Sequence, residues 1–219
     1  MKVKISLFSL SVIIFSIFVV FSYTVAKEAW QQIDFDITVK LQDHISRKWD
    51  EIFSYFSLGG SVELTMGIAV LMAFFYLFKK RFISFIGWLM IIPASFVEVF
   101  GKLLLFHPAP PILFHRNVLE TNLPSFSVHT NFSYPSGHMT RTIFLVAVFT
   151  MLALIGIKSF LVRWIVVGGL LSLALAMFVT RIYLGEHWLS DVIGGSLLGV
   201  SVGLFSSILI IKKTSSSIG

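Results

Sequence analysis

Two apolar runs joined by a short polar turn determine the fold class: LVRWIVVGGLLSLALAMFVT at residues 161–180, RIYLGEHWLS at 181–190 and DVIGGSLLGVSVGLFSSILII at 191–211. Each run has about the 20 residues that an α-helix needs to cross the hydrocarbon core of a bilayer. The charged residues of this stretch lie near the ends of the runs. The stretch therefore predicts two membrane-spanning helices, at about 161–180 and 190–211, with a tight turn over 181–189.

Four further apolar runs extend this pattern toward the N-terminus, at about 5–25, 61–78, 83–106 and 139–157. The 219-residue chain is 56% hydrophobic and only 13% charged, whereas soluble domains carry about 25% charged residues. The mean hydropathy is +0.90. We expect one all-α, polytopic membrane domain over residues 1–219, with six transmembrane helices in a bundle. The first run is longer than a signal-peptide core of about 7–15 residues, so we interpret it as an uncleaved helix.

The basic residues predict the orientation. One side of a six-span bundle collects a set of bases that the positive-inside rule assigns to the cytoplasm. These are Lys2, Lys4, Lys79, Lys80, Arg81, Lys158, Arg163, Lys212 and Lys213. We therefore expect a multi-pass protein of the cell membrane whose segments 26–60, 107–138 and 181–189 are extracytoplasmic.

The segment 26–60 mixes charged and apolar residues at helical spacing, with an apolar face that would include Ile33, Val39 and Leu41. Such a pattern is typical of an amphipathic helix that lies on the membrane surface. A cap helix packed on the loops is an equally good interpretation.

Composition excludes several other classes. The chain has no cysteine, so disulfides, thiolate catalysis and cysteine-containing zinc sites are absent. The net charge of +6 comes from scattered residues rather than from a basic stripe interleaved with aromatics. We therefore expect no nucleic-acid partner.

Charged and titratable residues also occur within or beside the predicted spans. Such groups are costly at membrane depth unless paired or hydrated, and they mark function by default. Each set alone could simply hold helices together, but all of them fall near the same ends of their spans. They are Glu98 and Lys102, His138 and Arg141, and Arg181, His187 and Asp191.

These residues have a shared chemistry. The turn Tyr134-Pro135-Ser136-Gly137-His138 leads into a helix start, whose free N–H groups favour an anion such as phosphate. Ser136, Lys102 and Arg181 can bind the same oxygens. His187 and Asp191 have the spacing of a nucleophile and its orienting carboxylate. His138 would then be the general acid.

A metal site built from His138, His187 and Asp191 is the competing interpretation. Lys102 and Arg181 would repel a cation there, so we expect neither a metal nor another cofactor.

The motif Pro135-Ser136-Gly137-His138, followed by Arg181-x5-His187-x3-Asp191, resembles the second and third signatures of the type 2 phosphatidic acid phosphatase family. Lys102 matches the lysine that opens the first signature. The resemblance implies a helical membrane bundle, a phosphohistidine intermediate and no metal. It implies His187 as nucleophile, Asp191 as its partner and His138 as acid. It assigns phosphate binding to Lys102, Ser136, Gly137 and Arg181.

The first signature departs from the family, because Ala109 occupies the position of a phosphate-binding arginine. Arg141, one turn beyond His138, is the favoured replacement, and Arg116 in the following loop is the alternative. His107 in the same loop is interpreted as structural, although it could also line the site.

The predicted activity is removal of phosphate from a lipid phosphate or pyrophosphate at the outer membrane face. Phosphatidylglycerophosphate, phosphatidic acid and undecaprenyl pyrophosphate are all candidate substrates. A phosphotransferase and a non-catalytic transporter or scaffold of the same shape remain the alternatives.

Overall fold

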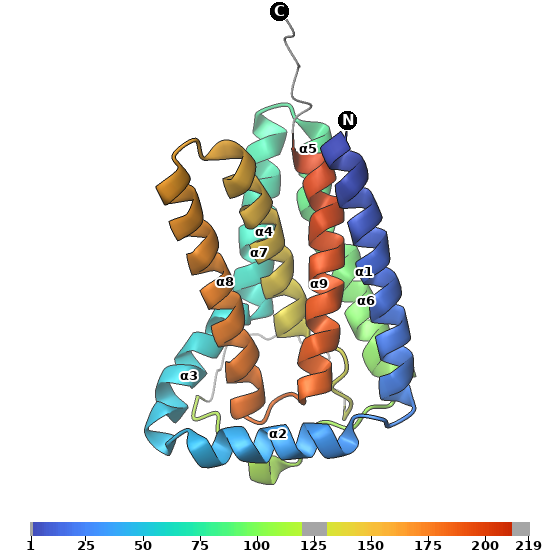
Figure 1. Ribbon diagram of the computed structural model, residues 1–219, viewed down its shortest axis with the longest axis vertical. Coiled ribbons are helices and arrows are strands. Elements are labelled where there is room, and N and C mark those ends of the chain that lie inside the picture. Colours follow the sequence, from blue (N-terminus) through green and yellow to red (C-terminus); the bar gives the residue numbers. More distant parts are fainter. Residues whose placement is uncertain (1, 120–130, 212–219) are drawn as a thin grey trace, which may run out of the picture.

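The computed structural model describes residues 2–119 and 131–211. Part of the predicted 107–138 segment, and the basic pair Lys212 and Lys213 used for orientation, lie outside these residues. Most of the described residues are helical, and the longest connection is the one between α6 and α7 (Figure 1). The helices are α1 (Lys2–Ala26), α2 (Gln31–His44), α3 (Asp50–Ser57), α4 (Val62–Phe78), α5 (Phe82–Leu89), α6 (Ile91–Leu104), α7 (Gly137–Gly156), α8 (Phe160–Tyr183) and α9 (Leu189–Ile210), with 3₁₀ turns at Arg47–Trp49, Leu58–Gly60 and Ile112–Phe114.

Among the described residues, six helical stretches are long and apolar enough to cross a membrane. The expected all-α polytopic architecture is therefore confirmed. The stretches are Val3–Ala26, Arg47–Phe78, Phe82–Leu104, Gly137–Gly156, Phe160–Tyr183 and Leu189–Ile210.

The second span begins earlier than the apolar run indicated. The sequence predicts a start near residue 61, but the apolar helical stretch runs over Arg47–Phe78. The 3₁₀ turn Leu58–Gly60 joins α3 to α4, and Ser61 then caps α4 by accepting a hydrogen bond from the Leu64 N–H at 3.3 Å. Two consecutive glycines, which are poor helix formers, account for the irregular turn inside this stretch.

The third span is divided into α5 and α6 at Met90. Pro93 explains the break. Proline has no N–H to donate to the carbonyl four residues earlier, and its ring crowds that carbonyl.

Helix α9 lies at the centre of the bundle, between α7 and α1 (Figure 1). Glycines allow α9 to approach α7 closely. A Cβ at Gly199 would lie 2.5 Å from the Thr140 carbonyl oxygen, and one at Gly203 would lie 2.7 Å from the Ala147 Cβ. Small residues at four-residue spacing are typical of close helix contacts in membranes. The contact brings the start of α7 against the start of α9.

Helix α2 crosses the end of the bundle where α8 and α9 meet (Figure 1). The Gln42 side chain donates to the carbonyl oxygens of Phe114 and Tyr183 at 2.7 and 2.9 Å. The buried side chains of α2 are Asp34 and Thr38, whereas Ile33 is 46% exposed. The predicted apolar face is therefore divided, because Leu41 packs against the core whereas Ile33 is exposed. A polar face packs inward, because Asp34 bonds to the start of α9 and Gln42 bonds to the end of α8. Helix α2 is therefore a packed cap.

Candidate active site

The connection into α7 is held against α9. The Ser136 N–H donates to the Asp191 carbonyl oxygen at 3.0 Å, and the Ser136 hydroxyl caps α7 by accepting from the Met139 N–H at 3.5 Å. At Gly137, an added Cβ would collide with the Glu98 carboxylate. The bare Cα of Gly137 therefore lets this carboxylate lie against the start of α7, and a larger residue there would displace it.

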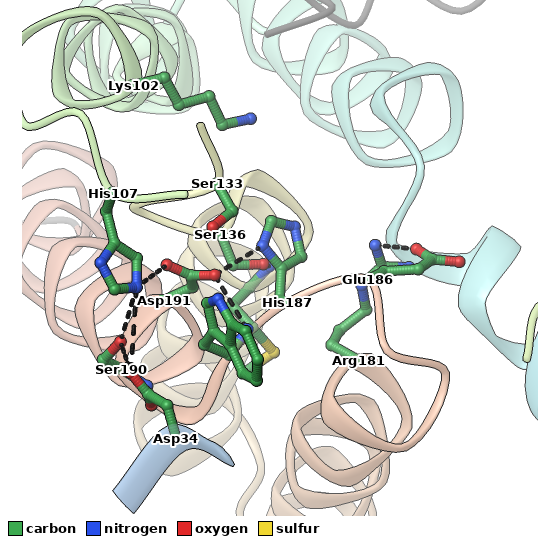
Figure 2. Close-up of polar contacts among 12 residues, drawn as sticks. Asp34, Lys102, His107, Ser133, Ser136, Arg181, Glu186, His187, Ser190 and Asp191 are labelled. Atoms are coloured by element: carbon green, nitrogen blue, oxygen red, sulfur yellow. Dashed lines mark hydrogen bonds and ion pairs between the residues drawn. The ribbon is translucent and has the colours of Figure 1, made fainter. Parts of the chain in front are cut away.

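His187 and Asp191 form a buried pair at the start of α9 (Figure 2). Asp191 Oδ2 lies 3.3 Å from His187 Nδ1 and accepts the Trp188 N–H at 2.9 Å. The carboxylate thus favours the tautomer with a proton on Nδ1. The Nε2 lone pair of His187 is then not used by Asp191.

Burial, together with the positive charge around His187, keeps its imidazole neutral. Burial lowers the pKa of His187 well below its ordinary value of about 6.5, and the positive charges of Arg181, Lys102 and Arg141 lower it further. A neutral imidazole is the nucleophilic form.

Three cationic side chains converge near this pair. Glu98 joins two of them, with Lys102 Nζ at 2.9 Å from Oε1 and an Arg141 guanidinium nitrogen at 2.7 Å from Oε2. The third, Arg181, is paired with Glu186 (Figure 2). Arg181 also donates to the Ser57 hydroxyl. Glu98, Arg141 and Arg181 are all buried.

His138 lies in the first turn of α7, within electrostatic range of His187 and of all three cations. Its ring packs against Gly60, where an added Cβ would come within 2.9 Å of Cδ2. No other described residue hydrogen-bonds to this ring, so its nitrogens are available to a substrate. The predicted residues of the site are thus brought together from α6, α7, α8 and α9.

The two candidates for the missing arginine are placed differently. Arg141 shares Glu98 with Lys102 and faces the histidines. Arg116 instead donates to the carbonyl oxygens of Gln42 and Ile45 and to the Tyr183 hydroxyl, at 3.0, 3.3 and 3.1 Å. The guanidinium of Arg116 is therefore engaged in holding α2 to α8.

Sequence reasoning did not assign a role to four polar residues that support the site. Ser57 and Glu186 hold Arg181, and Asp34 and Ser190 bond to each other behind Asp191. Glu186 could have been found from its position beside His187. Asp34 and Ser57 come from distant segments that only the fold brings near.

The competing metal-site interpretation gains no support from the geometry. In the described part of the chain, no three His, Asp or Glu side chains converge in a way that could hold a metal ion.

These features define a class: a polytopic membrane protein with a buried histidine–aspartate pair and clustered cations at one end of its bundle. The model of the PAP2 superfamily matches residues 85–215. Since the match covers more than half of the 219 residues, the chain belongs to the PAP2 superfamily. The resemblance predicted from the signatures is confirmed.

Two solved structures share the fold. One is the first transmembrane PAP2 type phosphatidylglycerolphosphate phosphatase from Bacillus subtilis, with 18% identity, a TM-score of 0.67 and coverage of 90% of this chain and 93% of that one. The other is Aquifex aeolicus LpxE, with 21% identity, a TM-score of 0.56 and coverage of 80% and 94%. Comparison with curated protein sequences finds no match.

Proposed function

We propose that the protein removes a phosphate from a membrane lipid phosphate or pyrophosphate through a phosphohistidine intermediate. One observation carries the proposal. The pair His187–Asp191 lies buried among three cationic side chains, in a membrane bundle that belongs to the PAP2 superfamily. A neutral imidazole surrounded by positive charge is suited to attack a phosphoryl group and to stabilise the charge on its oxygens.

The reaction has two steps. In the first, the Nε2 lone pair of His187 forms a bond to phosphorus, the bond from phosphorus to the leaving oxygen breaks, and His138 donates a proton to that oxygen. In the second, His138 takes a proton from water, the resulting hydroxide attacks the phosphohistidine, and the bond from phosphorus to Nε2 breaks. Asp191 stabilises the positive imidazole that forms on His187. Inorganic phosphate leaves and His187 is restored.

The phosphoryl oxygens bind to Lys102, Arg141 and Arg181 and to the start of α7 at Ser136 and Gly137. Arg141 supplies the positive charge that is lacking at Ala109. Glu98 supports this assignment, because its two oxygens hold Lys102 and Arg141 side by side at 2.9 and 2.7 Å. The cations neutralise the phosphate, so the reaction needs no metal ion.

We further propose that the site faces the extracytoplasmic side. The described bases Lys79, Lys80, Arg81 and Lys158 lie in the connections at the opposite ends of the spans, and Arg163 lies in the first turn of α8 at that same end. Phosphatidylglycerophosphate, phosphatidic acid and undecaprenyl pyrophosphate are the candidate substrates. The phosphatidylglycerolphosphate phosphatase activity of the Bacillus subtilis structure favours the first as the initial compound to test.

The test is release of inorganic phosphate by purified protein in detergent micelles from each of these three lipids. We expect release from at least one lipid and none from a His187→Ala variant. His115→Ala, at an exposed loop histidine, is the matched control and should keep full activity. Release that survives His187→Ala would contradict the proposal. Transfer of the phosphoryl group to a second lipid in place of release would identify a phosphotransferase.

A further inference from the structure

Asp191 has a free oxygen on the side away from His187. Its Oδ2 is used by His187 and by the Trp188 N–H, but the fully buried Oδ1 has no hydrogen-bond partner among the described residues. A buried carboxylate oxygen without a donor is costly, and such an atom in a native structure requires an explanation. The nearest titratable group on that side is His107, whose Nε2 lies 3.6 Å from Oδ1 (Figure 2).

His107 is buried and held in place. Its carbonyl oxygen accepts the Ser133 N–H at 3.0 Å, and its ring meets the Tyr134 ring edge-on, with centroids 6.3 Å apart. These contacts tie the His107 loop to the turn that enters α7. Burial lowers the pKa of His107, so the ring is neutral near pH 7 and carries one N–H.

Two carboxylates and a hydroxyl compete for that N–H. Nε2 of His107 lies 3.4 Å from the Ser190 hydroxyl, 3.6 Å from Asp191 and 3.9 Å from Asp34. The Asp34 carboxylate already accepts the Ser190 N–H at 2.8 Å and the Ser190 hydroxyl at 2.7 Å. Asp191 Oδ1 is therefore the acceptor that still lacks a hydrogen-bond donor. The Ser133 hydroxyl is the other donor within reach of the Asp191 carboxylate, but within ordinary hydrogen-bond distance it donates to the Pro108 carbonyl oxygen, at 3.4 Å.

We infer that His107 is a positioning residue for the catalytic pair: its Nε2–H donates to Asp191 Oδ1 and thereby keeps Oδ2 directed at His187. The distance of 3.6 Å lies just beyond the hydrogen-bond range, so the donation requires the ring and the carboxylate to approach by a few tenths of an ångström. Asp34 completes the arrangement from α2. By bonding to Ser190 in the first turn of α9, it fixes the helix start that carries Asp191.

This inference rests on the proposed function, and its test is a comparison of kcat and KM. His107→Met removes the donor but fills the same space, so we expect kcat to fall about tenfold or more, the usual size of a lost orienting partner, with little change in KM. His107→Gln carries an amide N–H at a similar reach and should recover most of the loss. His115→Met is the matched control and should match the wild type.

A substitution at Asp34 tests whether its bonds to Ser190 help to position Asp191. Asp34→Asn should lower kcat in the same direction as His107→Met, whereas Asp36→Asn, at an exposed position of the same helix, should leave kcat unchanged.

The outcomes separate this inference from the proposed function. If the wild type hydrolyses a lipid phosphate and His107→Met is equally active, the role of His107 is overturned and the proposed function stands. A folded His107→Gln variant as impaired as His107→Met would also overturn that role, because the loss would then reflect packing rather than a donated hydrogen bond. A wild type without phosphatase or transferase activity would instead overturn the proposed function.

Discussion

At the scale of single residues, the site combines a neutral histidine, which is the proposed nucleophile, with concentrated positive charge. The two features are linked, because the cations that can bind phosphate are also those that oppose protonation of His187. Removing one of them therefore affects both phosphate binding and the charge state of the nucleophile.

The lowered pKa of His187 predicts the pH dependence of activity. The neutral form is the nucleophile, so kcat/KM should be lost on the acid side only at a pH well below 6.5, the ordinary value for histidine. The pH dependence of kcat/KM measures this limit, because it reports pKa values of the free enzyme. Loss of kcat/KM on the acid side with an apparent pKa at or above 6.5 would contradict the assignment of His187 as the nucleophile.

The same shift predicts how stability varies with pH. Because the folded pKa of His187 is lower than the unfolded pKa, the unfolded chain takes up the proton first as pH falls. The contribution of this residue to stability is present above about 6.5 and is lost as the pH falls toward the folded pKa. Denaturation midpoints in micelles from pH 7.5 to 5 should fall less for a His187→Gln variant than for the wild type.

Arg141 gives a prediction for phosphate binding. Arg141→Ala should lower kcat by about 10²-fold or more if this side chain stabilises the charge on the phosphoryl oxygens, and it should also raise the acid limit of kcat/KM. Arg116→Ala should leave kcat within a few-fold of the wild type, because Arg116 is bonded to α2 and Tyr183. The reverse pattern would transfer the role to Arg116.

The sequence could predict the site residues that belong to its own motifs. His138, His187 and Asp191 are recognisable because their spacing reflects local helix and turn geometry. Glu98 could be paired with Lys102 from the four-residue spacing, but its second bond to Arg141 depends on how α6 packs on α7. Asp34 was beyond prediction, because an acidic residue on an amphipathic segment is ordinarily exposed.

At the scale of elements, the packing of α7 on α9 aligns the two halves of the site. Gly199→Ala would bring a methyl group to 2.5 Å from the Thr140 carbonyl oxygen, so α7 and α9 must separate. We expect a loss of about 1–3 kcal/mol in stability and reduced activity, measured by thermal unfolding in micelles and by phosphate release.

Gly168→Ala is the matched control for this substitution. Nothing lies within 4 Å of an added Cβ at Gly168, and alanine favours the helix over glycine. This variant should be as stable as the wild type or slightly more stable. Equal effects of the two substitutions would contradict the account of α7–α9 packing.

The spans illustrate which elements a sequence predicts well. The long apolar runs predicted the bounds of five of the six helical stretches to within a few residues, because the length and hydropathy of a span are local properties of the sequence. The start of the second stretch and the burial of Asp34 and Thr38 on α2 were not predicted. The inward packing of α2 depends on polar groups such as Asp34 and Gln42, which are satisfied by distant parts of the chain.

At the scale of the whole molecule, the distribution of basic residues predicts that the site end of the bundle is extracytoplasmic. The chain has no cysteine, so single-cysteine variants can report orientation directly. Lys40→Cys on exposed α2 should react with a membrane-impermeant maleimide in intact cells. Lys79→Cys, exposed at the opposite end, should react only after permeabilisation. The opposite labelling pattern would show that the site end of the bundle faces the cytoplasm.

The central claim is that His187 carries the phosphoryl group during turnover. Rapid mixing of the enzyme with a lipid phosphate that it hydrolyses, followed by an alkaline quench that preserves phosphohistidine and by peptide mass spectrometry, tests this claim most directly. We predict a phosphoryl group on the peptide that contains His187, formed no more slowly than phosphate is released and absent from the His187→Ala variant. A phosphoryl group on another residue, or full turnover with no modified peptide at any time, would contradict the mechanism.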